Sequence, residues 1–220
     1  MMQKSKLDNY NSVRGAQSYK GDYSTKLHRK VSDGLERRIF ARFFARLPKL
    51  ASVLDLPCGA GRLYSLLQER VPRVVEADWS ATMVELDRRD HQAAAAGYLR
   101  CSALEIPVAA NAFDLAVSIR LSHHLETEAD RERHLRELFR VARHAVIVTW
   151  FSHWSLKNLL RRLRQPFNKK QPKNTMRTSA ARQVALSAGF RLADVVPLSR
   201  LGSGHVFGLF VRQDSEHQPS

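Results

Sequence analysis

The stretch Ser52-Val-Leu-Asp-Leu-Pro-Cys-Gly-Ala-Gly-Arg62 combines a short apolar run, an acidic residue and two glycines. The apolar run predicts a buried strand, the glycines predict a tight loop, and the residues that follow have helical spacing. Gly59 and Gly61 allow the backbone to approach a ligand closely, and the amino end of a helix attracts anionic groups. The stretch therefore predicts a ligand-binding loop, although glycine pairs also occur in plain strand-to-helix turns.

Short apolar runs alternate with amphipathic segments on both sides of this loop. Strands are predicted over 53–55, 74–77, 98–101, 113–119, 145–150, 191–196 and 205–212, and helices over 32–47, 62–69, 80–89, 127–142 and 178–188. Ser80 and Thr127 are predicted to cap the helices that begin there. Such alternation is typical of an α/β fold in which helices cover both faces of a mostly parallel sheet. The connection between the last two strands is short, so we expect the final pair to be antiparallel.

The composition limits the possible classes of protein. A chain of 220 residues fits one domain, and no apolar run reaches the roughly 20 residues of a membrane-spanning helix. The N-terminus lacks the apolar core of a secretory signal. Cys58 and Cys101 are the only cysteines, too few for a disulfide framework or a four-cysteine zinc site. We therefore expect a cytoplasmic protein, soluble or peripheral at the inner membrane, with no bound metal.

The charge is strongly positive, with 36 Lys and Arg against 21 Asp and Glu, a formal net charge of +15. The excess lies in the first 31 residues and between Phe151 and Ala193, where no acidic residue occurs. We expect a basic N-terminal arm or lid over 1–31, one domain over 32–212 with a basic insert at 152–177, and a disordered tail at 213–220. The charge favours nucleic acid, acidic lipid or a phosphorylated substrate as partner, although the insert also fits a solvated surface helix.

Other residues at the predicted strand ends narrow the choice of ligand, because ligands of open parallel sheets bind beyond the carboxyl ends of the strands. Asp78 stands 23 residues after Asp55 and suits a ribose diol, and Trp79 beside it could cover an adenine ring. A nicotinamide dinucleotide site needs a third glycine where this chain has Tyr64. A phosphate-binding P-loop is excluded because no Gly-Lys-Ser/Thr follows the glycines.

Three segments resemble motifs of the class I S-adenosylmethionine-dependent methyltransferases. Val53–Arg62 resembles the first motif, Glu76–Met83 the motif of the second strand, and Ala103–Ser118 the passage from third to fourth strand. The nearest subgroup is that of ubiquinone-type and related small-molecule methyltransferases, with a weaker similarity to methyltransferases of bacterial envelope glycans. The resemblance implies a Rossmann-like sheet of seven strands with an antiparallel last strand, and S-adenosylmethionine as cofactor.

The resemblance also implies roles for individual residues in holding that cofactor. The loop would surround the methionine part, Asp78 would bind the ribose, and Trp79 would lie beside the adenine. The implied cofactor-binding residues are Asp55, Pro57, Cys58, Gly59, Gly61, Arg62, Asp78, Trp79, Met83 beneath the pocket, Ser102, Ala103 and Leu104 at the adenine edge, and Ile119 as its floor.

The chain departs from the family pattern at three places. Pro57 replaces the usual first loop glycine, and Ser102 replaces an aspartate that often faces the adenine amino group. Arg143-His144 replaces a Pro-Gly-Gly turn before the fifth strand. We expect the second change to weaken or move one adenine contact, and the third to affect only the turn.

Candidate catalytic residues follow the fourth predicted strand. Arg120, His123 and His124 lie there, and a histidine titrates near neutral pH, as a general base must. A base is needed only for an acceptor hydroxyl of high pKa, because positioning of the reactants can supply much of the rate acceleration of a methyl transfer. Tyr19, Tyr23 and His28 either close over the pocket or are ordinary surface residues.

The acceptor is less determined than the cofactor. Enzymes that methylate base amino groups carry Asn/Asp-Pro-Pro-Tyr/Phe after the fourth strand, where this chain reads Ser-Ile-Arg-Leu-Ser-His-His-Leu, which disfavours nucleic acid. We expect methyl transfer to an oxygen or nitrogen of a small, lipid-linked or glycan acceptor, including one of lipopolysaccharide assembly. The alternatives are a cofactor-binding scaffold protein that acts through a partner, and an RNA methyltransferase. The insert at 152–177 could bind a protein partner or an anionic membrane.

Overall fold

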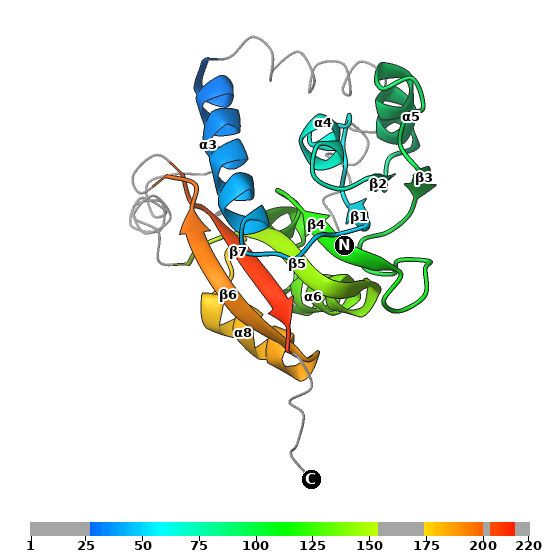
Figure 1. Ribbon diagram of the computed structural model, residues 1–220. Helices are drawn as coiled ribbons and strands as arrows, with labels where there is room; N and C mark the ends of the chain where they lie inside the picture. Colours follow the sequence, from blue (N-terminus) through cyan, green and yellow to red (C-terminus); the bar gives the residue numbers. More distant parts are fainter. Residues whose placement is uncertain (1–26, 154–173, 200–202, 214–220) are drawn as a thin grey trace.

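The computed structural model describes residues 27–153, 174–199 and 203–213, with side chains from residue 31. Seven strands form one sheet in the order β3-β2-β1-β4-β5-β7-β6 (Figure 1). Their bounds are Ser52–Asp55 (β1), Arg73–Asp78 (β2), Gly97–Arg100 (β3), Phe113–Ser118 (β4), Ala142–Phe151 (β5), Phe190–Pro197 (β6) and His205–Arg212 (β7). Only β7 runs antiparallel to its neighbours β5 and β6. The predicted fold class, including the antiparallel last strand, is confirmed.

Helices cover both faces of this sheet, as the sequence predicts. α3 (Leu27–Phe44) and α4 (Tyr64–Gln68) pack on one face, and α6 (Glu128–Val141) and α8 (Thr178–Ser187) pack on the other. α5 (Ala81–Asp90) contacts β2 and β3 (Figure 1). A short 3-10 turn, η1, spans Ser122–His124.

Four predicted boundaries are wrong by two residues or more. α3 ends at Phe44 instead of residue 47, because the Arg46 and Leu47 amides bond to carbonyls three residues back, in a tighter turn than an α-helix. α3 begins at Leu27 instead of residue 32, because 27–31 contains no glycine or proline to stop the helix. α4 begins at Tyr64 instead of Arg62, because Gly61 has φ +68°, outside the helical region. β5 begins three residues early, so Arg143 and His144 lie inside the strand and do not form a separate turn.

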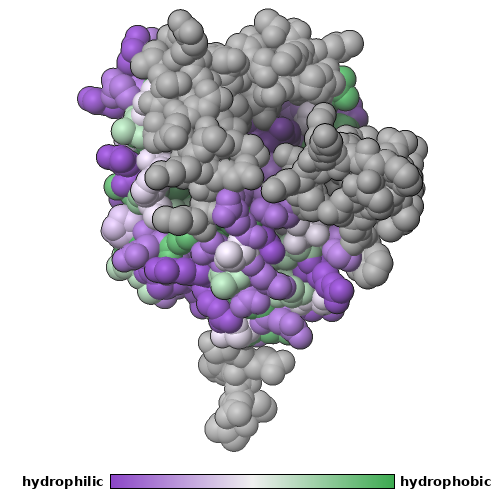
Figure 2. All heavy atoms as spheres, turned by 180° about the vertical axis from the view of Figure 1, so that it is seen from behind, coloured by the Kyte–Doolittle hydropathy of each residue, from purple (hydrophilic) through white to green (hydrophobic). Residues whose placement is uncertain are grey.

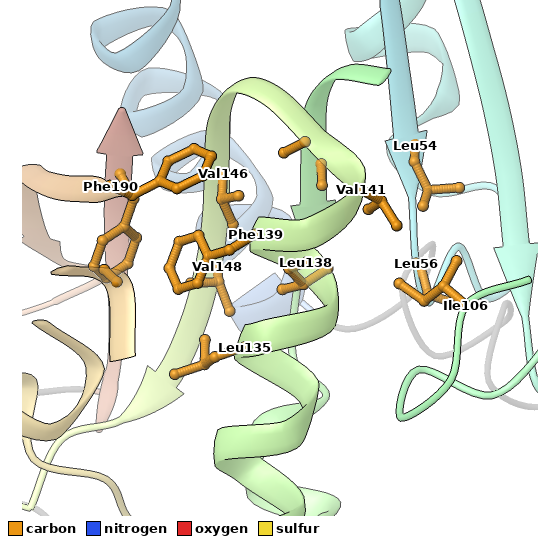
Figure 3. Packing of buried hydrophobic residues seen from close by; sticks show 14 of the residues in the cluster. Leu54, Leu56, Ile106, Leu135, Leu138, Phe139, Val141, Val146, Val148 and Phe190 are labelled. Carbon is orange, nitrogen blue, oxygen red and sulfur yellow. The ribbon is translucent and has the colours of Figure 1, made fainter. Parts of the chain in front are cut away.

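Two hydrophobic cores hold the layers together. On one face Leu135, Leu138 and Phe139 of α6 point toward Val146 and Val148 of β5 (Figure 3). On the other face α3 contributes the buried side chains of Ile39, Phe40 and Phe43. The view from behind shows mainly hydrophilic side chains on the coloured surface (Figure 2).

Two capped helices begin just past the sheet's carboxyl edge. The Ser80 hydroxyl accepts a hydrogen bond from the Met83 amide at 3.2 Å, and Thr127 accepts one from Asp130 at 3.0 Å. Both caps were predicted from the sequence, and each satisfies an amide that the helix leaves unpaired. The loops before α5 and α6 therefore start from fixed points beside the strand ends.

Several expected features lie outside the described residues. They are the arm up to residue 26 with Tyr19 and Tyr23, most of the basic insert, and the tail from residue 214. His28 lies within α3. Within the described part of the chain, no helix has the length and hydrophobicity that a bilayer crossing requires.

Gly208 of β7 gives a test of the packing around β5. A Cβ atom there would lie 2.6 Å from the indole ring of the fully buried Trp150. We expect Gly208→Ala to lower the free energy of unfolding by about 1–3 kcal/mol, measured by chemical denaturation, because the overpacked ring must move. The control is Gly97→Ala in β3, where the nearest atom would lie at 3.7 Å. Equal losses in both variants would contradict this packing.

Candidate functional site

The loop after β1 folds back onto the end of β2. The Cys58 amide donates to the Ala77 carbonyl at 2.8 Å, and the Gly61 amide donates to the Cys58 carbonyl at 3.2 Å. Gly59 and Gly61 have φ of +59° and +68°, a conformation that favours glycine, and the Leu56-Pro57 peptide bond is cis. The loop is therefore held at the carboxyl edge of β1 and β2. α4 is only a short helix, so it adds less to an anion site than the predicted longer helix would.

Asp78 ties this loop to α5. One carboxylate oxygen accepts a hydrogen bond from the Gly59 amide at 3.0 Å, and the other accepts one from the Ser80 amide at 2.8 Å. Burial raises the pKa of Asp78 to about 6, while bonds from the Ser80, Gly59 and Trp79 amides oppose that rise. Each oxygen can accept a further hydrogen bond, so the carboxylate can still receive a ligand's hydroxyl groups.

The predicted adenine edge is attached to Asp78 through the backbone. The Cys101 amide donates to the Asp78 carbonyl at 3.1 Å, and the Ser102 hydroxyl accepts from the Leu104 amide at 3.1 Å. Trp79 is 46% exposed, and the Arg100 guanidinium lies 5.9 Å from its ring centroid. An exposed aromatic face thus lies beside the acid that ends β2.

Met83, Ile119 and Asp55 are buried members of the predicted cofactor set, as are Cys58, Gly61 and Asp78. Met83 and Ile119 are at most 5% exposed, which fits the floor of a pocket as well as ordinary core packing. Asp55 is fully buried, and both of its oxygens are without a hydrogen-bond partner in the described residues. Burial raises the pKa of Asp55, and the Arg62 charge opposes that rise. An unpaired carboxylate beneath the loop fits a ligand that carries an ammonium or sulfonium group.

Glu36 of α3 joins the loop to the end of β4, a link that the sequence analysis missed. Its carboxylate is 1% exposed and pairs with Arg62 at 2.8 Å and with Arg120. Arg120 also donates to the Ser32 hydroxyl at 3.0 Å and has φ +66°, an uncommon conformation for a residue other than glycine. Arg120 therefore fastens α3 over the site, and an arginine paired in this way does not act as a base.

Histidines and an aromatic ring cluster beyond β4 and β5. The ring centroid of His123 lies 4.1 Å from that of His124, 4.5 Å from that of Phe151 and 5.3 Å from that of His205. His205 was not predicted, and it arrives here because β7 runs antiparallel and begins at this edge. Asn174 donates to the Leu125 carbonyl at 2.9 Å and thereby holds the backbone after η1. The cluster forms a second wall next to the strand ends.

His134 links β4 to the adenine edge, and it too was missed. The Ala103 carbonyl lies 3.0 Å from Nδ1 and must accept from it, so Nε2 accepts from the Ser118 hydroxyl at 3.0 Å. Burial lowers the pKa of His134 to about 4, so the ring is neutral at pH 7. Its position on the apolar stripe of α6, beside Leu135, is the sequence feature that could have identified His134 as a buried residue.

A basic groove lies at the opposite edge of the sheet. It is lined by Arg46 and Pro48 after α3 and by Arg143, Arg191 and Arg212 at strand ends. Arg143 and Arg191 are near the amino ends of β5 and β6, so the groove faces away from the loop after β1. It is therefore separate from the candidate site.

His134 provides a pH-dependent test. The folded chain keeps this ring neutral, so its stabilising contribution is present above pH 6.5 and is lost as the pH falls toward 4. We expect a loss of about 3 kcal/mol in unfolding free energy over that window, and His134→Gln should abolish this part of the pH dependence. The exposed His144 supplies the control variant, His144→Gln. A pH dependence that is the same in wild type and His134→Gln would contradict the assignment.

Comparisons with known proteins agree with this geometry. Residues 54–148 match a family model described as a methyltransferase domain. The chain is 35% identical over 112 residues to a tRNA (carboxymethyluridine(34)-5-O)-methyltransferase of Xenopus tropicalis, covering 49% of this chain and 17% of that protein. It is 33% identical over 123 residues to a demethylmenaquinone methyltransferase of Thermus thermophilus, covering 52% of this chain and 54% of that one.

A solved structure extends the likeness to nearly the whole chain. Magnesium protoporphyrin IX methyltransferase from Synechocystis, with bound S-adenosylhomocysteine, superimposes with a TM-score of 0.77 at 17% identity, covering 96% of this chain and 100% of that one. The matched part covers 17% of the tRNA methyltransferase and 54% of the demethylmenaquinone methyltransferase, so the chain spans only part of the length of these curated relatives. The menaquinone relative is consistent with the expected subgroup. Residues 54–148 thus match a methyltransferase domain, in agreement with the expectation from the three motifs.

Proposed function

We propose that this chain transfers a methyl group from S-adenosylmethionine to an oxygen or nitrogen of a small acceptor that carries negative charge. The observation that carries the proposal is the Asp78 carboxylate, which holds the Gly59 amide at the end of β1 and the Ser80 amide at the start of α5. That contact brings the glycine loop, a ribose-binding acid and the exposed Trp79 to one edge of the sheet, where open parallel sheets bind ligands.

Each part of the site has a role in holding the cofactor. Gly59 and Gly61 let the methionine part approach the loop, and the Asp78 oxygens accept hydrogen bonds from the ribose hydroxyls. Trp79 covers one face of the adenine, and the segment Ser102–Leu104, held by His134, borders its edge. Asp55 supplies negative charge beneath the loop, opposite the positive charge of the methionine part.

Methyl transfer by direct displacement requires no covalent intermediate with the protein. When bound, S-adenosylmethionine supplies a sulfonium methyl carbon that an acceptor oxygen or nitrogen attacks in line; the carbon–sulfur bond breaks and S-adenosylhomocysteine is released. The chain positions the acceptor, excludes water, and receives the acceptor's proton where that proton is not lost beforehand. His123 and His124 are candidates to accept the proton at a ring nitrogen, whereas Arg120 positions α3.

The acceptor class rests on charge and on relatives. A net charge of +15 favours an anionic acceptor, including the lipid-linked or glycan acceptors of envelope assembly. The named relatives act on a tRNA nucleoside, a menaquinone precursor and a porphyrin, so likeness within this domain does not select one acceptor. RNA is the second candidate, favoured by the similarity to the tRNA methyltransferase. A scaffold that binds the cofactor without turnover is the third.

Asp78→Asn tests the cofactor site. The amide nitrogen cannot accept hydrogen bonds, so at least one of the contacts to the Gly59 amide, the Ser80 amide and the ribose is lost. We expect the Kd for S-adenosylmethionine to rise by tenfold to a hundredfold, equivalent to about 1–3 kcal/mol, in calorimetric titration. Asp90→Asn, an exposed acid at the end of the same α5, is the matched control. Unchanged affinity in Asp78→Asn, with a native circular dichroism spectrum, would refute the ribose assignment.

His123→Gln tests the proton acceptor. S-adenosylhomocysteine formation should be followed from pH 5 to pH 9 with fractionated cell extract, once intact and once treated with ribonuclease. If His123 is the base, the initial rate at limiting extract, which is proportional to kcat/KM, should fall by about 10²-fold or more and lose its acidic limb, whereas His124→Gln should keep that limb. Identical pH profiles in both variants and the wild type would exclude both histidines as the base.

The same assay distinguishes the acceptor classes. Loss of turnover after ribonuclease treatment would favour an RNA acceptor, and cofactor binding without any turnover would favour the scaffold function.

A further inference from the structure

A thiol and two carboxylates from three separate elements meet beneath the cofactor loop. Cys58 belongs to the loop, Glu76 to β2 and Asp87 to α5, and one ligand atom from each lies within 4.8 Å of the others. The side chains are buried, with 5% exposure for Cys58 and 0% for Glu76 and Asp87. His91, just after α5, places Nδ1 at 2.7 Å from one Asp87 oxygen. We refer to Cys58, Glu76, Asp87 and His91 as the thiol-carboxylate cluster.

The carboxylate oxygens of this cluster lack the partners that buried charges require. Within the described residues, both oxygens of Glu76 and the Oδ2 of Asp87 have no hydrogen-bond partner outside the cluster, and they face only each other and the Cys58 thiol. Asp87 Oδ1 is the atom that contacts His91. Burying an unpaired carboxylate costs several kcal/mol, and buried charges in proteins are normally paired or coordinate metals. The ion pairs of nearby Arg62 go to Asp33 and Glu36. The cluster therefore calls for another source of positive charge.

The donor atoms indicate which source fits. Thiolate sulfur together with carboxylate oxygen is a donor set for zinc and related transition metals, whereas calcium and magnesium take oxygen alone. Carboxylates that ligate metals are themselves hydrogen-bonded by neighbouring side chains, as His91 Nδ1 would do for Asp87 here. We propose that Cys58 Sγ, a Glu76 carboxylate oxygen and Asp87 Oδ2 bind one zinc-class divalent cation, and that His91 positions Asp87.

The place of the cluster gives the metal a structural role. A Cβ atom on Gly61 would lie 1.9 Å from Asp87 Oδ1 and 2.5 Å from His91, so the loop backbone rests directly on the cluster. A cation that joins Cys58 to Glu76 and Asp87 would fasten the loop to β2 and α5 from below, while Asp78 fastens it from the edge. Counting cysteines alone predicts no such site, because two of the three ligands are carboxylates on separate elements.

The main competing explanation is a proton shared between Glu76 and Asp87. Two carboxyl groups in one buried place can keep one proton between them, with a strongly raised pKa. That arrangement needs neither the Cys58 thiolate nor a metal. The two explanations therefore differ in metal content and in the fate of the thiol.

The test uses the full chain, purified without chelator or affinity metal. We expect about one zinc per chain by inductively coupled plasma mass spectrometry, and on exchange into Co²⁺ an intense thiolate-to-cobalt charge-transfer band. Cys58→Ser should abolish that band, and Glu76→Gln should lower the metal content at least tenfold. Cys101→Ser removes the only other cysteine, also buried, and should keep both the band and the metal.

A second measurement protects the test against variants that fail to fold. Chelator removal of the metal from the wild-type chain should lower its Tm, and added Zn²⁺ should restore it, whereas Mg²⁺ should not. Metal-free protein with an unchanged Tm and no cobalt band would overturn the proposal in favour of the shared proton. A cobalt band that persists in Cys58→Ser and disappears in Cys101→Ser would overturn it as well.

Discussion

The carboxylate of Asp78 is the contact on which the geometry of the site depends. β1 and β2 are parallel neighbours, so the loops that follow them leave the sheet at the same edge. Asp78 accepts the Gly59 amide from one loop and the Ser80 amide from the other, and its carbonyl accepts the Cys101 amide from beyond β3. One residue thus sets the spacing of three loops that come from distant parts of the chain.

Electrostatics add a second layer to this arrangement. Acids lie beneath the loop, at Asp55, Glu76 and Asp87, whereas Arg62 and Arg120 pair with the buried Glu36. The Glu36 contacts hold α3 over the loop and the end of β4. Within the part of the chain that the structure describes, Arg62 acts on Asp55 and His91 contacts Asp87, which is little positive charge for three buried acids. A cationic cofactor near Asp55 and a metal at the thiol-carboxylate cluster would together supply it.

The sequence predicts the local features well and the long-range contacts poorly. Ser80 and Thr127 were predicted as caps because a cap and the amide it bonds lie three residues apart. Glu36 and Arg120 are separated by 84 residues and His134 and Ala103 by 31, and no periodic pattern links such pairs. His205 joins the histidine cluster only through the direction of β7. Pro57 stays a departure from the motif, now seen to follow a cis peptide bond inside an otherwise recognisable loop.

We propose that the ligand-binding edge formed by Asp78 and the glycine loop holds S-adenosylmethionine. Hydrogen–deuterium exchange of the full chain, with and without this compound, tests this proposal. We expect slower amide exchange in 56–63, 78–83 and 101–104 on addition of the cofactor, and unchanged exchange in α8. Unchanged exchange in those three segments, or protection confined to the basic groove at the opposite edge, would contradict it.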